Sequence, residues 1–321
     1  MESIELEAGW DTLKHTGESE YIFKRIDSVC IPELNIGINS SLERCLSLEL
    51  PKKCSADFQT ITRQNLTLLH FLEPNCIVLQ LTDDTYNDLF NDLVVSLYQR
   101  VKNIPDASEC SMLFIQTFHK WSEFFHDETL DRLNKDTIKG LFGELFVLKS
   151  FVQKSTSANV NGVLNSWTGP YDQGHDFVLD NKEIEVKTKG LTKISVRISS
   201  EQQLDNSIGK SLELLVLSVE EDLIDGVSVG DLVHEIRLLI INFLGDTSIL
   251  LRAINQKGLT LKNIKDYDNF RFRPVNKSIY DCLKSGFPKL IKDNLLEPIS
   301  NVKYDINLSV LDDYLLESEQ L

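Results

Sequence analysis

The chain has no long hydrophobic run. Its longest apolar stretch, residues 236–244, is interrupted by Arg237 and Asn242. That stretch is much shorter than the roughly 20 apolar residues that a membrane-spanning helix needs. The first residues, 1–5, are acidic where a secretory signal would be basic and then apolar. The sequence therefore predicts neither a membrane protein nor an exported one.

Glycine and proline are scarce, and the cysteines are scattered. The 321 residues include 15 Gly and 8 Pro, well below the level of low-complexity or collagen-like chains, so we expect an ordered protein. The 6 cysteines form no Cys-x-x-Cys pair and have no His pair at zinc spacing, which predicts free thiols in a reducing cytoplasm. With 42% apolar residues, the chain has enough material for the cores of two or three domains.

Several common catalytic signatures are missing. The sequence contains no G-x-x-x-x-G-K-[ST] loop and no G-x-G-x-x-G after a strand, which argues against nucleotide hydrolysis. It has no G-x-S-x-G elbow to support Ser-His-Asp chemistry. His119 and His126 would share a helical face, but no Cys pair accompanies them, so we expect no metal site there.

Basic residues are in the minority. The 33 Lys and Arg face 49 Asp and Glu, a net charge of −16, which argues against a free-standing nucleic-acid binder with a globally basic surface. The charge is uneven: −10 over residues 1–135, −2 over 136–220 and −4 over 221–321. Within the middle segment, residues 182–197 carry a local +3. The middle of the chain is therefore the part best suited to a negatively charged ligand.

Hydrophobic periodicity predicts a mixed α+β protein. In the N-terminal third we expect strands at 34–38, 45–50 and 76–81, then a helix starting near 85–88. A second helix carries an aromatic stripe that we expect in the core: Phe114, Phe118, Trp121 and Phe125. The C-terminal third predicts one helix over 231–243, followed by strand-like pieces between prolines.

The middle segment, residues 136–220, has a different order of predicted elements: a helix, three strands, a helix and a strand. The expected elements are a helix over 136–151, a polar loop over 155–166, strands at 177–179, 184–188 and 194–198, a short helix over 199–204 and a buried strand at 212–219. We expect an N-terminal α+β accessory domain over 1–130, a core domain over 131–225 and a C-terminal α+β accessory region over 226–321.

Two acidic residues and a lysine in this segment could carry chemistry. Alternation along a strand puts Glu185 and Lys187 on one face and the apolar residues on the other. If Asp176 begins the preceding strand of a hairpin, its carboxylate lies across from Glu185. Two such carboxylates form the all-oxygen site that Mg²⁺ prefers, and the lysine could orient or help deprotonate an attacking water. Alone, however, an acidic-x-Lys triplet is equally an ordinary charged strand face.

The context of the triplet strengthens the chemical interpretation. Glu144 falls on the apolar face of its predicted helix, where a buried carboxylate needs a metal or a lysine, unless it sits at the edge of the face and reaches solvent. Gly140 and Gly143 in the same helix predict close approach of another backbone. Gln202 and Gln203 could hydrogen-bond phosphate or the catalytic water, or could be surface residues.

Taken together, these residues resemble a known family. A helix with Glu144, then Asp176, then Glu185-x-Lys187 and a helix with Gln202 resembles the PD-(D/E)xK nuclease superfamily. Its runs G-L-F-G-E-L, W-x-G-P, H-D-F, E-V-K-T and I-S-S-E-Q-Q-L are similar to PD-(D/E)xK proteins encoded beside DNA methyltransferases and ATPases in bacterial restriction or anti-phage clusters. The usual Pro before the Asp is His175 here.

The resemblance implies a fold and roles for individual residues. The fold is a restriction-endonuclease-like αβββαβ core with a mixed sheet, flanked by the N-terminal and C-terminal α+β regions. Asp176 and Glu185 would bind Mg²⁺, for which Mn²⁺ could substitute, with the Val186 carbonyl as a further ligand. Lys187 would position the nucleophilic water. The other implied contacts are Glu144 as an auxiliary metal ligand or supporting acid, Gln202 to water or backbone, and His175, Lys189, Lys193 and Arg197 to DNA phosphates.

For those last four residues the plain alternatives stay open: a turn-capping histidine and solvated charges. The function that follows is a Mg²⁺-dependent DNA endonuclease of a bacterial restriction or anti-phage system, working in the cytoplasm. Its expected partners are DNA, an ATPase or methyltransferase from the same gene cluster, and a second copy of the chain. The alternatives are a non-catalytic subunit that keeps the nuclease fold to scaffold a complex or dock DNA, and a nuclease directed at RNA.

Overall fold

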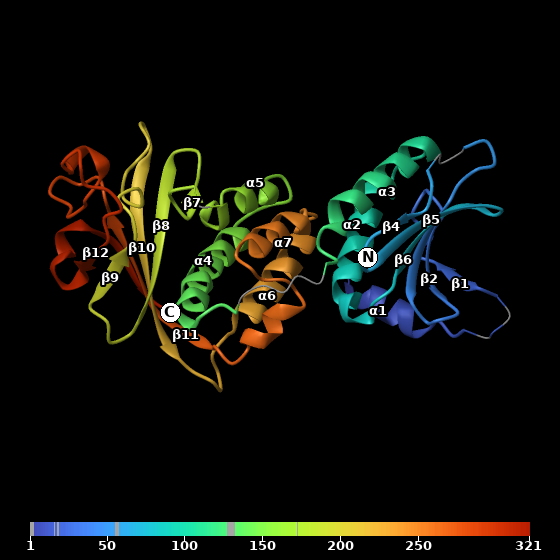
Figure 1. The fold of residues 1–321 in the computed structure, drawn as a ribbon, viewed down its shortest axis with the longest axis horizontal. Coiled ribbons are helices and arrows are strands. Elements are labelled where there is room, and N and C mark those ends of the chain that lie inside the picture. The colour runs from blue at the N-terminus through green and yellow to red at the C-terminus, as the bar shows by residue number, and fades with distance from the viewer. Residues whose placement is uncertain (1–2, 16, 18, 55–57, 127–131, 172) are drawn as a thin grey trace. The chain divides into compact units, whose positions relative to one another are not determined.

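The computed structural model of the chain, drawn as a ribbon in Figure 1, describes residues 3–15, 17, 19–54, 58–126, 132–171 and 173–321. These residues form two compact units, Met1–Thr129 and Leu130–Leu321. The predicted domain boundary at 130–131 and the first two residues of the acidic N-terminus lie outside the described residues. Each unit has its own β-sheet, so each has its own core.

The first unit is an antiparallel sheet with helices. Its strand order is β1-β2-β3-β6-β5-β4. The elements are α1 (Ser3–Asp11), β1 (Tyr21–Arg25), β2 (Leu34–Asn39), β3 (Arg44–Glu49), β4 (Ile61–Thr62), β5 (Leu66–Leu72), β6 (Asn75–Leu81), the 3-10 turn η1 (Asp84–Tyr86), α2 (Asn87–Val101) and α3 (Ala107–Ser122). The four aromatic side chains of the predicted stripe, three in α3 and Phe125 just after it, are fully buried, which confirms that they belong to the core. The sequence did not predict α1, β1, β4 or β5.

The second unit contains a mixed sheet with the order β13-β11-β10-β8-β7. Its strands are β7 (Phe177–Val178), β8 (Lys182–Gly190), β10 (Ser211–Glu221), β11 (Phe272–Asp281) and β13 (Leu315–Gln320). β8 and β10 run parallel, and the other neighbours are antiparallel. A separate two-stranded sheet pairs β9 (Ser195–Ile198) with β12 (Tyr304–Asn307). The predicted mixed α+β fold with a mixed sheet is confirmed.

Helices cover one face of this sheet (Figure 1). They are α4 (Lys135–Gln153), α5 (Val160–Asn165), α6 (Val229–Asn242) and α7 (Thr247–Gln256). The 3-10 turns are η2 (Gly169–Tyr171), η3 (Asn263–Tyr267), η4 (Lys292–Asn294), η5 (Leu308–Val310) and η6 (Asp312–Tyr314). α4 begins where the side chain of Asn134 accepts a hydrogen bond from Thr137 N, a standard N-cap. It packs on β8 and on α6.

The two glycines of α4 differ in their surroundings. A Cβ on Gly143 would lie 1.8 Å from Thr188 Oγ1, so this glycine lets the helix approach β8 closely. A Cβ on Gly140 would meet nothing within 4 Å. The prediction of close backbone approach is therefore supported at Gly143 and wrong at Gly140, which instead lines the cavity described below.

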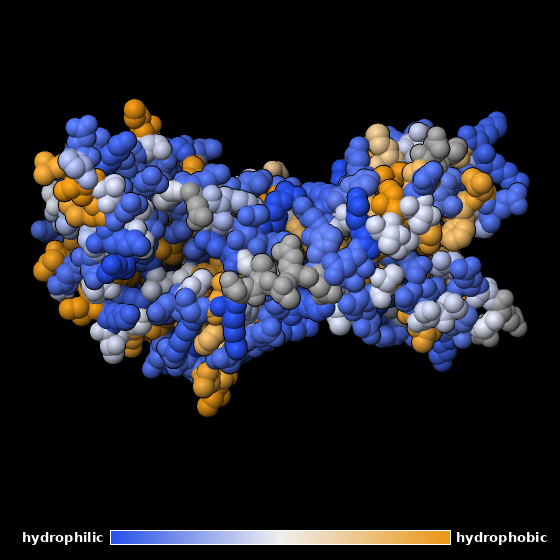
Figure 2. Space-filling model, viewed as in Figure 1, coloured by the Kyte–Doolittle hydropathy of each residue, from blue (hydrophilic) through white to orange (hydrophobic). Residues whose placement is uncertain are grey.

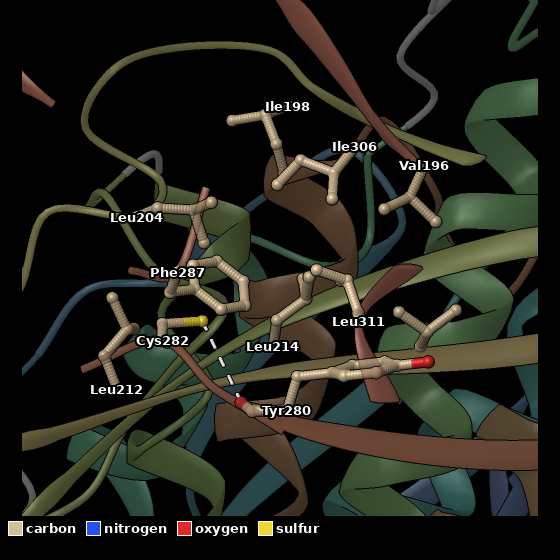
Figure 3. Close-up of a cluster of buried hydrophobic side chains, with 11 residues drawn as sticks. Val196, Ile198, Leu204, Leu212, Leu214, Tyr280, Cys282, Phe287, Ile306 and Leu311 are labelled. Carbon is tan, nitrogen blue, oxygen red and sulfur yellow. Dashed lines mark hydrogen bonds between the residues drawn. The ribbon is translucent and has the colours of Figure 1, made fainter. Parts of the chain in front are cut away.

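A hydrophobic cluster covers the opposite face of the sheet (Figure 3). Its members come from β9, β10, β11, β12 and the segments around them: Val196, Ile198, Leu204, Leu212, Leu214, Val216, Tyr280, Cys282, Phe287, Ile306 and Leu311. Leu214 pairs with Glu185 in the parallel β8–β10 register, so both side chains project from this same face. The face of β8 that carries Glu185 is therefore partly covered by this hydrophobic cluster, and residues 226–321 contribute several of its members.

Two local expectations are wrong, and one expected strand is present but pairs outside the main sheet. The segment expected as a short helix over 199–204 forms turns, because Ser199 N bonds to the Gln203 side chain and the backbone bonds run from Gln203 N to Ser200 O and from Asp205 N to Gln202 O. The expected polar loop over 155–166 contains α5. The strand expected at 194–198 leaves the main sheet and pairs with β12.

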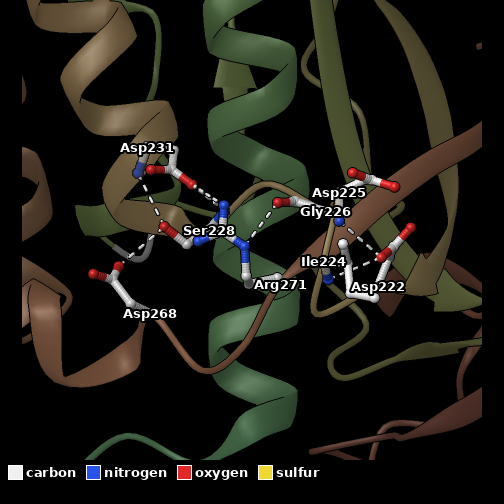
Figure 4. Close-up of polar contacts among 8 residues, drawn as sticks. All are labelled: Asp222, Ile224, Asp225, Gly226, Ser228, Asp231, Asp268 and Arg271. Carbon is white, nitrogen blue, oxygen red and sulfur yellow. Dashed lines mark hydrogen bonds and ion pairs between the residues drawn. The ribbon is translucent and has the colours of Figure 1, made fainter.

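Polar contacts fix the connection from β10 to α6 (Figure 4). Asp222 Oδ1 accepts hydrogen bonds from the backbone N–H groups of Ile224 and Asp225. Arg271 donates to Gly226 O at 2.8 Å and to Asp231 Oδ2 at 2.9 Å. A reciprocal capping box between Ser228 and Asp231 starts α6. The start of this helix is therefore held by several independent contacts.

The visible surface is mostly hydrophilic, with hydrophobic side chains in small separate groups (Figure 2). The six cysteines are free thiols, as the sequence predicts. Within the described ranges, no helix combines the length and the apolar character that crossing a membrane requires.

Candidate active site

A cavity of about 650 Å³ lies in the second unit, beside β8. Its walls come from α4, Gly169, residues 173–176, β8, β9, the turn at 199–203 and Lys257, the residue that caps α7. The residues to which the family resemblance gave a role all line it: Glu144, His175, Asp176, Glu185, Val186, Lys187, Lys189, Lys193, Arg197 and Gln202. The fold therefore brings together residues that span almost sixty positions of the chain.

Asp176 is fixed at the open edge of β8. The pairing of β7 with β8 ends at Phe177 and Ile184. Beyond this pair, the Asp176 carboxylate replaces a strand partner, because it accepts a hydrogen bond from Val186 N at 2.8 Å. The N–H and C=O of one strand residue point to the same edge, so the Val186 carbonyl also faces the Asp176 side of the strand. The backbone of Asp176 is held in turn, because its carbonyl accepts bonds from Thr168 N and Gly169 N.

Glu185 and Lys187 form an ion pair on one face of β8. Lys187 Nζ lies 2.7 Å from Glu185 Oε1 and donates a hydrogen bond to Gln203 Oε1 at 3.0 Å. The same Gln203 oxygen accepts a bond from Ser199 N at 2.7 Å, so the turn at 199–203 holds the lysine head group. Glu185 is 1% exposed, so this ion pair is almost completely buried on the carboxylate side.

Glu144 reaches the same cavity from α4. Its Oε2 accepts a hydrogen bond from the indole Nε1 of Trp167 at 2.8 Å, and its Oε1 lies 4.0 Å from Lys257 Nζ. A Cβ added to Gly169 would lie 2.6 Å from Glu144 Oε2 and 2.7 Å from Asp176 Oδ1. Only a glycine at this position leaves room for both carboxylates.

Burial raises the pKa of all three carboxyl groups. For Glu144, burial and then the charge of Asp176 raise the pKa to about 8. Burial likewise raises the pKa of Asp176, and it raises that of Glu185 well above the usual range, with Asp176 adding to the effect. Lys187 and Lys257 act in the opposite direction on Glu144 and Asp176. Three ionised carboxylates are therefore unfavourable here without additional positive charge.

The oxygen donors of the site fit a hard divalent cation. Mg²⁺ in proteins is commonly held by one or two carboxylates, several waters and substrate phosphate. Asp176, Glu185 and the Val186 carbonyl supply such a donor set, and a cation would offset the burial that raises the pKa of the two carboxyl groups. In the described part of the chain, however, no three His, Cys, Asp or Glu side chains are grouped so that they could hold a metal ion by themselves.

The expected phosphate contacts differ in availability. Lys189 and Lys193 line the cavity, and burial lowers the pKa of Lys189. Arg197 is exposed but donates a long hydrogen bond of 3.5 Å to Asp305. The His175 side chain is only 7% exposed and faces Glu183, with 3.8 Å between Nδ1 and Oε2. Burial lowers the pKa of this histidine, so its ring is a weaker candidate for a phosphate contact than the two lysines.

Three further residues, Trp167, Gly169 and Lys257, belong to the site but were not predicted from the sequence to act in it, and Gln203 was a candidate together with Gln202. Gln203, rather than Gln202, contacts Lys187. Trp167 and Gly169 stand in the W-x-G-P run, a motif that carried the family resemblance without a role for either residue. Lys257 comes from a region expected to be accessory, and no local pattern marks it.

A comparison with protein families gives one match. The family model described as "Putative PD-(D/E)XK family member, (DUF4420)" matches residues 6–309, which cover nearly the whole chain and both units. No curated protein and no solved structure matches the chain.

Proposed function

The chain belongs to this PD-(D/E)XK family, and from that premise we propose that it is a Mg²⁺-dependent endonuclease that hydrolyses phosphodiester bonds in DNA. One observation carries the proposal. The carboxylates of Asp176 and Glu185 and the amine of Lys187 line one cavity, where burial raises the pKa of both carboxyl groups. Two carboxylates buried at one cavity are costly to ionise, and a bound divalent cation would offset that cost.

In this proposal each side chain has a separate task. Asp176, Glu185 and the Val186 carbonyl would hold Mg²⁺, or Mn²⁺ in its place, and the bound ion would supply positive charge next to the phosphate oxygens. Lys187, its amine fixed by Glu185 and Gln203, would orient the water that attacks phosphorus. Lys189 and Lys193 would bind neighbouring phosphates, with Arg197 and His175 as further candidates, and Gln202 would contact water or the DNA backbone.

We also propose a setting for the activity. The family resemblance supports a role in a bacterial restriction or anti-phage system in the cytoplasm, with a DNA methyltransferase or an ATPase as partner. The net charge of −16 supports weak, salt-sensitive DNA binding by the isolated chain, with further affinity from those partners. Because cutting both strands of a duplex calls for two active sites, a dimer or a larger complex fits best.

A non-catalytic subunit with the same fold, which would dock DNA or scaffold a complex, is the second candidate. The observation that favours it is that the described residues contain no ready-made group of three metal-binding side chains. The two candidates differ in whether the carboxylates bind a divalent ion.

Calorimetric titration with MgCl₂ and MnCl₂ separates them. We expect the wild-type chain to bind either ion, and Asp176→Asn and Glu185→Gln to lose most of the binding heat. Glu183→Gln is the matched control, because Glu183 projects from the same face of β8 and is equally buried but lies outside the cavity lining. Binding that is absent, or unaffected by the two site variants, would leave the non-catalytic subunit as the better account.

A further inference from the structure

Lys257 is a second lysine at the cavity, from a part of the chain far from the predicted catalytic strand. It forms the C-terminal cap of α7, and α7 packs against η2, the turn that begins at Gly169. The Lys257 side chain is 25% exposed and lines the same cavity as Asp176 and Glu185. Tertiary packing thus brings a second cation into the cavity that also contains the lysine of the acidic-x-Lys triplet.

The amine of Lys257 keeps its hydrogen-bonding capacity. Its nearest acidic oxygen, Glu144 Oε1, is 4.0 Å away, which is beyond hydrogen-bond distance. By contrast, Lys187 donates to Gln203, and Lys139, another lysine of the cavity wall, donates to Asp136 at 2.6 Å. Within the ranges that the structure describes, Lys257 has no hydrogen-bond acceptor, so its donors are available to a ligand in the cavity.

Glu144 is held in a way that suits the support of this lysine. The Trp167 indole donates a hydrogen bond to Glu144 Oε2, and Gly169 packs closely beside the same oxygen. The other oxygen, Oε1, faces Lys257. When it is ionised, a carboxylate with one oxygen anchored and the other 4.0 Å from an amine attracts that amine by charge and leaves its hydrogen-bond donors unused.

We propose that Lys257 binds a backbone phosphate of the nucleic acid, and that Glu144 is the positioning residue that holds Lys257 in the cavity. An ammonium group with unused donors is a good partner for a phosphate oxygen. The proposal rests on the proposed function, since it needs a nucleic-acid backbone in the cavity. It gives Glu144 a role through Lys257 rather than as a metal ligand.

The test measures duplex DNA binding by fluorescence anisotropy in EDTA at about pH 9, where Glu144 is ionised, over a series of KCl concentrations. A lysine that neutralises one phosphate contributes about 0.9 to the slope of log affinity against log salt. We expect Lys257→Gln to weaken binding and to lower the slope by about that amount, and Lys257→Arg, which keeps the charge, to restore the slope. Thermal unfolding of each variant checks that the fold persists.

Lys149→Gln is the matched control. Lys149 is also 25% exposed and is ion-paired, to Glu235, but it lies outside the cavity lining. Its replacement removes the same charge from the same unit, and we expect the wild-type slope. Glu144→Gln should lower the slope part of the way, and the double variant should fall no lower than Lys257→Gln alone, because both changes act on one contact.

The outcomes are distinct. A wild-type slope in Lys257→Gln, or an equal loss in Lys149→Gln, would overturn the role of Lys257 and leave the proposed endonuclease standing. Additive losses from Glu144→Gln and Lys257→Gln would overturn the positioning role of Glu144. A wild-type chain that binds no DNA at low salt would overturn both this inference and the proposed substrate.

Discussion

Trp167 donates a hydrogen bond from its indole Nε1 to Glu144 Oε2 across 2.8 Å, and both side chains are buried. The bond joins α4 to the segment that precedes β7, and so it ties the helix to the loop that also holds the backbone of Asp176. Burial raises the pKa of Glu144 to about 8, and the indole bond acts against that rise by stabilising the ionised form.

Trp167→Phe should therefore destabilise the second unit. Leaving a buried carboxylate oxygen without its donor costs about 1–3 kcal/mol, in addition to the lost ring volume. The cost should be larger above pH 8, where Glu144 is ionised, than near about pH 6. Urea unfolding at the two pH values measures it.

Trp121→Phe is the control, because Trp121 is equally buried but its Nε1 has no partner among the described residues. Its cost should reflect ring volume alone and should not grow with pH. An equal, pH-independent cost for the two variants would show that the indole bond contributes nothing.

The two glycines of α4 should respond in opposite ways to alanine. Gly143→Ala puts a methyl group 1.8 Å from Thr188 Oγ1, so the helix must move away from β8, at a cost of about 1–3 kcal/mol. Gly140→Ala meets nothing within 4 Å and should stabilise the helix by roughly 0.5–1 kcal/mol. The free energy of unfolding of both variants, measured with urea, checks the pair. Equal effects would contradict the packing of α4 on β8.

The metal-free protein should lose stability as the pH rises. The pKa of Glu144 is raised in the folded state from 4.5 to about 8, so the folded protein keeps a proton that the unfolded chain releases. This contribution to stability is fully present below pH 4.5 and disappears as the pH rises through about 8. Glu144→Gln, which stays neutral, should show a smaller fall in Tm across this range in EDTA, and Mg²⁺ should reduce the fall in the wild type. A steeper fall in the variant would contradict the assignment.

Gln203 should matter more for catalysis than Gln202. Gln203→Ala removes the acceptor that holds Lys187 Nζ at 3.0 Å, and a hydrogen bond to a charged group is worth about 1.5–3 kcal/mol. The cleavage rate should therefore fall by roughly 10- to 150-fold at saturating DNA. Gln202 is exposed and makes no such bond, so Gln202→Ala should cost less. A larger loss in Gln202→Ala would reverse the two assignments.

The sequence predicted what depends on local pattern. Helix α4, strands β8 and β10 and the convergence of Asp176 with the Glu185-x-Lys187 triplet follow from periodicity, alternation and the spacing of a family motif. These features depend on residues that are close together in the chain, so the spacing of apolar and polar residues is enough to predict them.

The remainder depends on long-range packing. Lys257 enters the site only because α7 packs on η2, and β9 leaves the main sheet because β12, more than a hundred residues later, pairs with it. The short helix expected at 199–204 fails because the Gln203 side chain binds Ser199 N, a competition that propensity does not reveal. Trp167 and Gly169 stand in a motif that the sequence shows, but their contacts with Glu144 could be identified only from the folded structure.

The most direct measurement of the central claim is cleavage of plasmid DNA by the wild-type chain and by Glu185→Gln, with Mg²⁺ and with EDTA. We expect cleavage by the wild type only with Mg²⁺, and a rate at least about 10³-fold lower for the variant, since a lost metal ligand removes several kcal/mol of charge stabilisation. Both proteins should have the same circular dichroism spectrum. Equal cleavage by the two, or cleavage that persists in EDTA, would contradict the account.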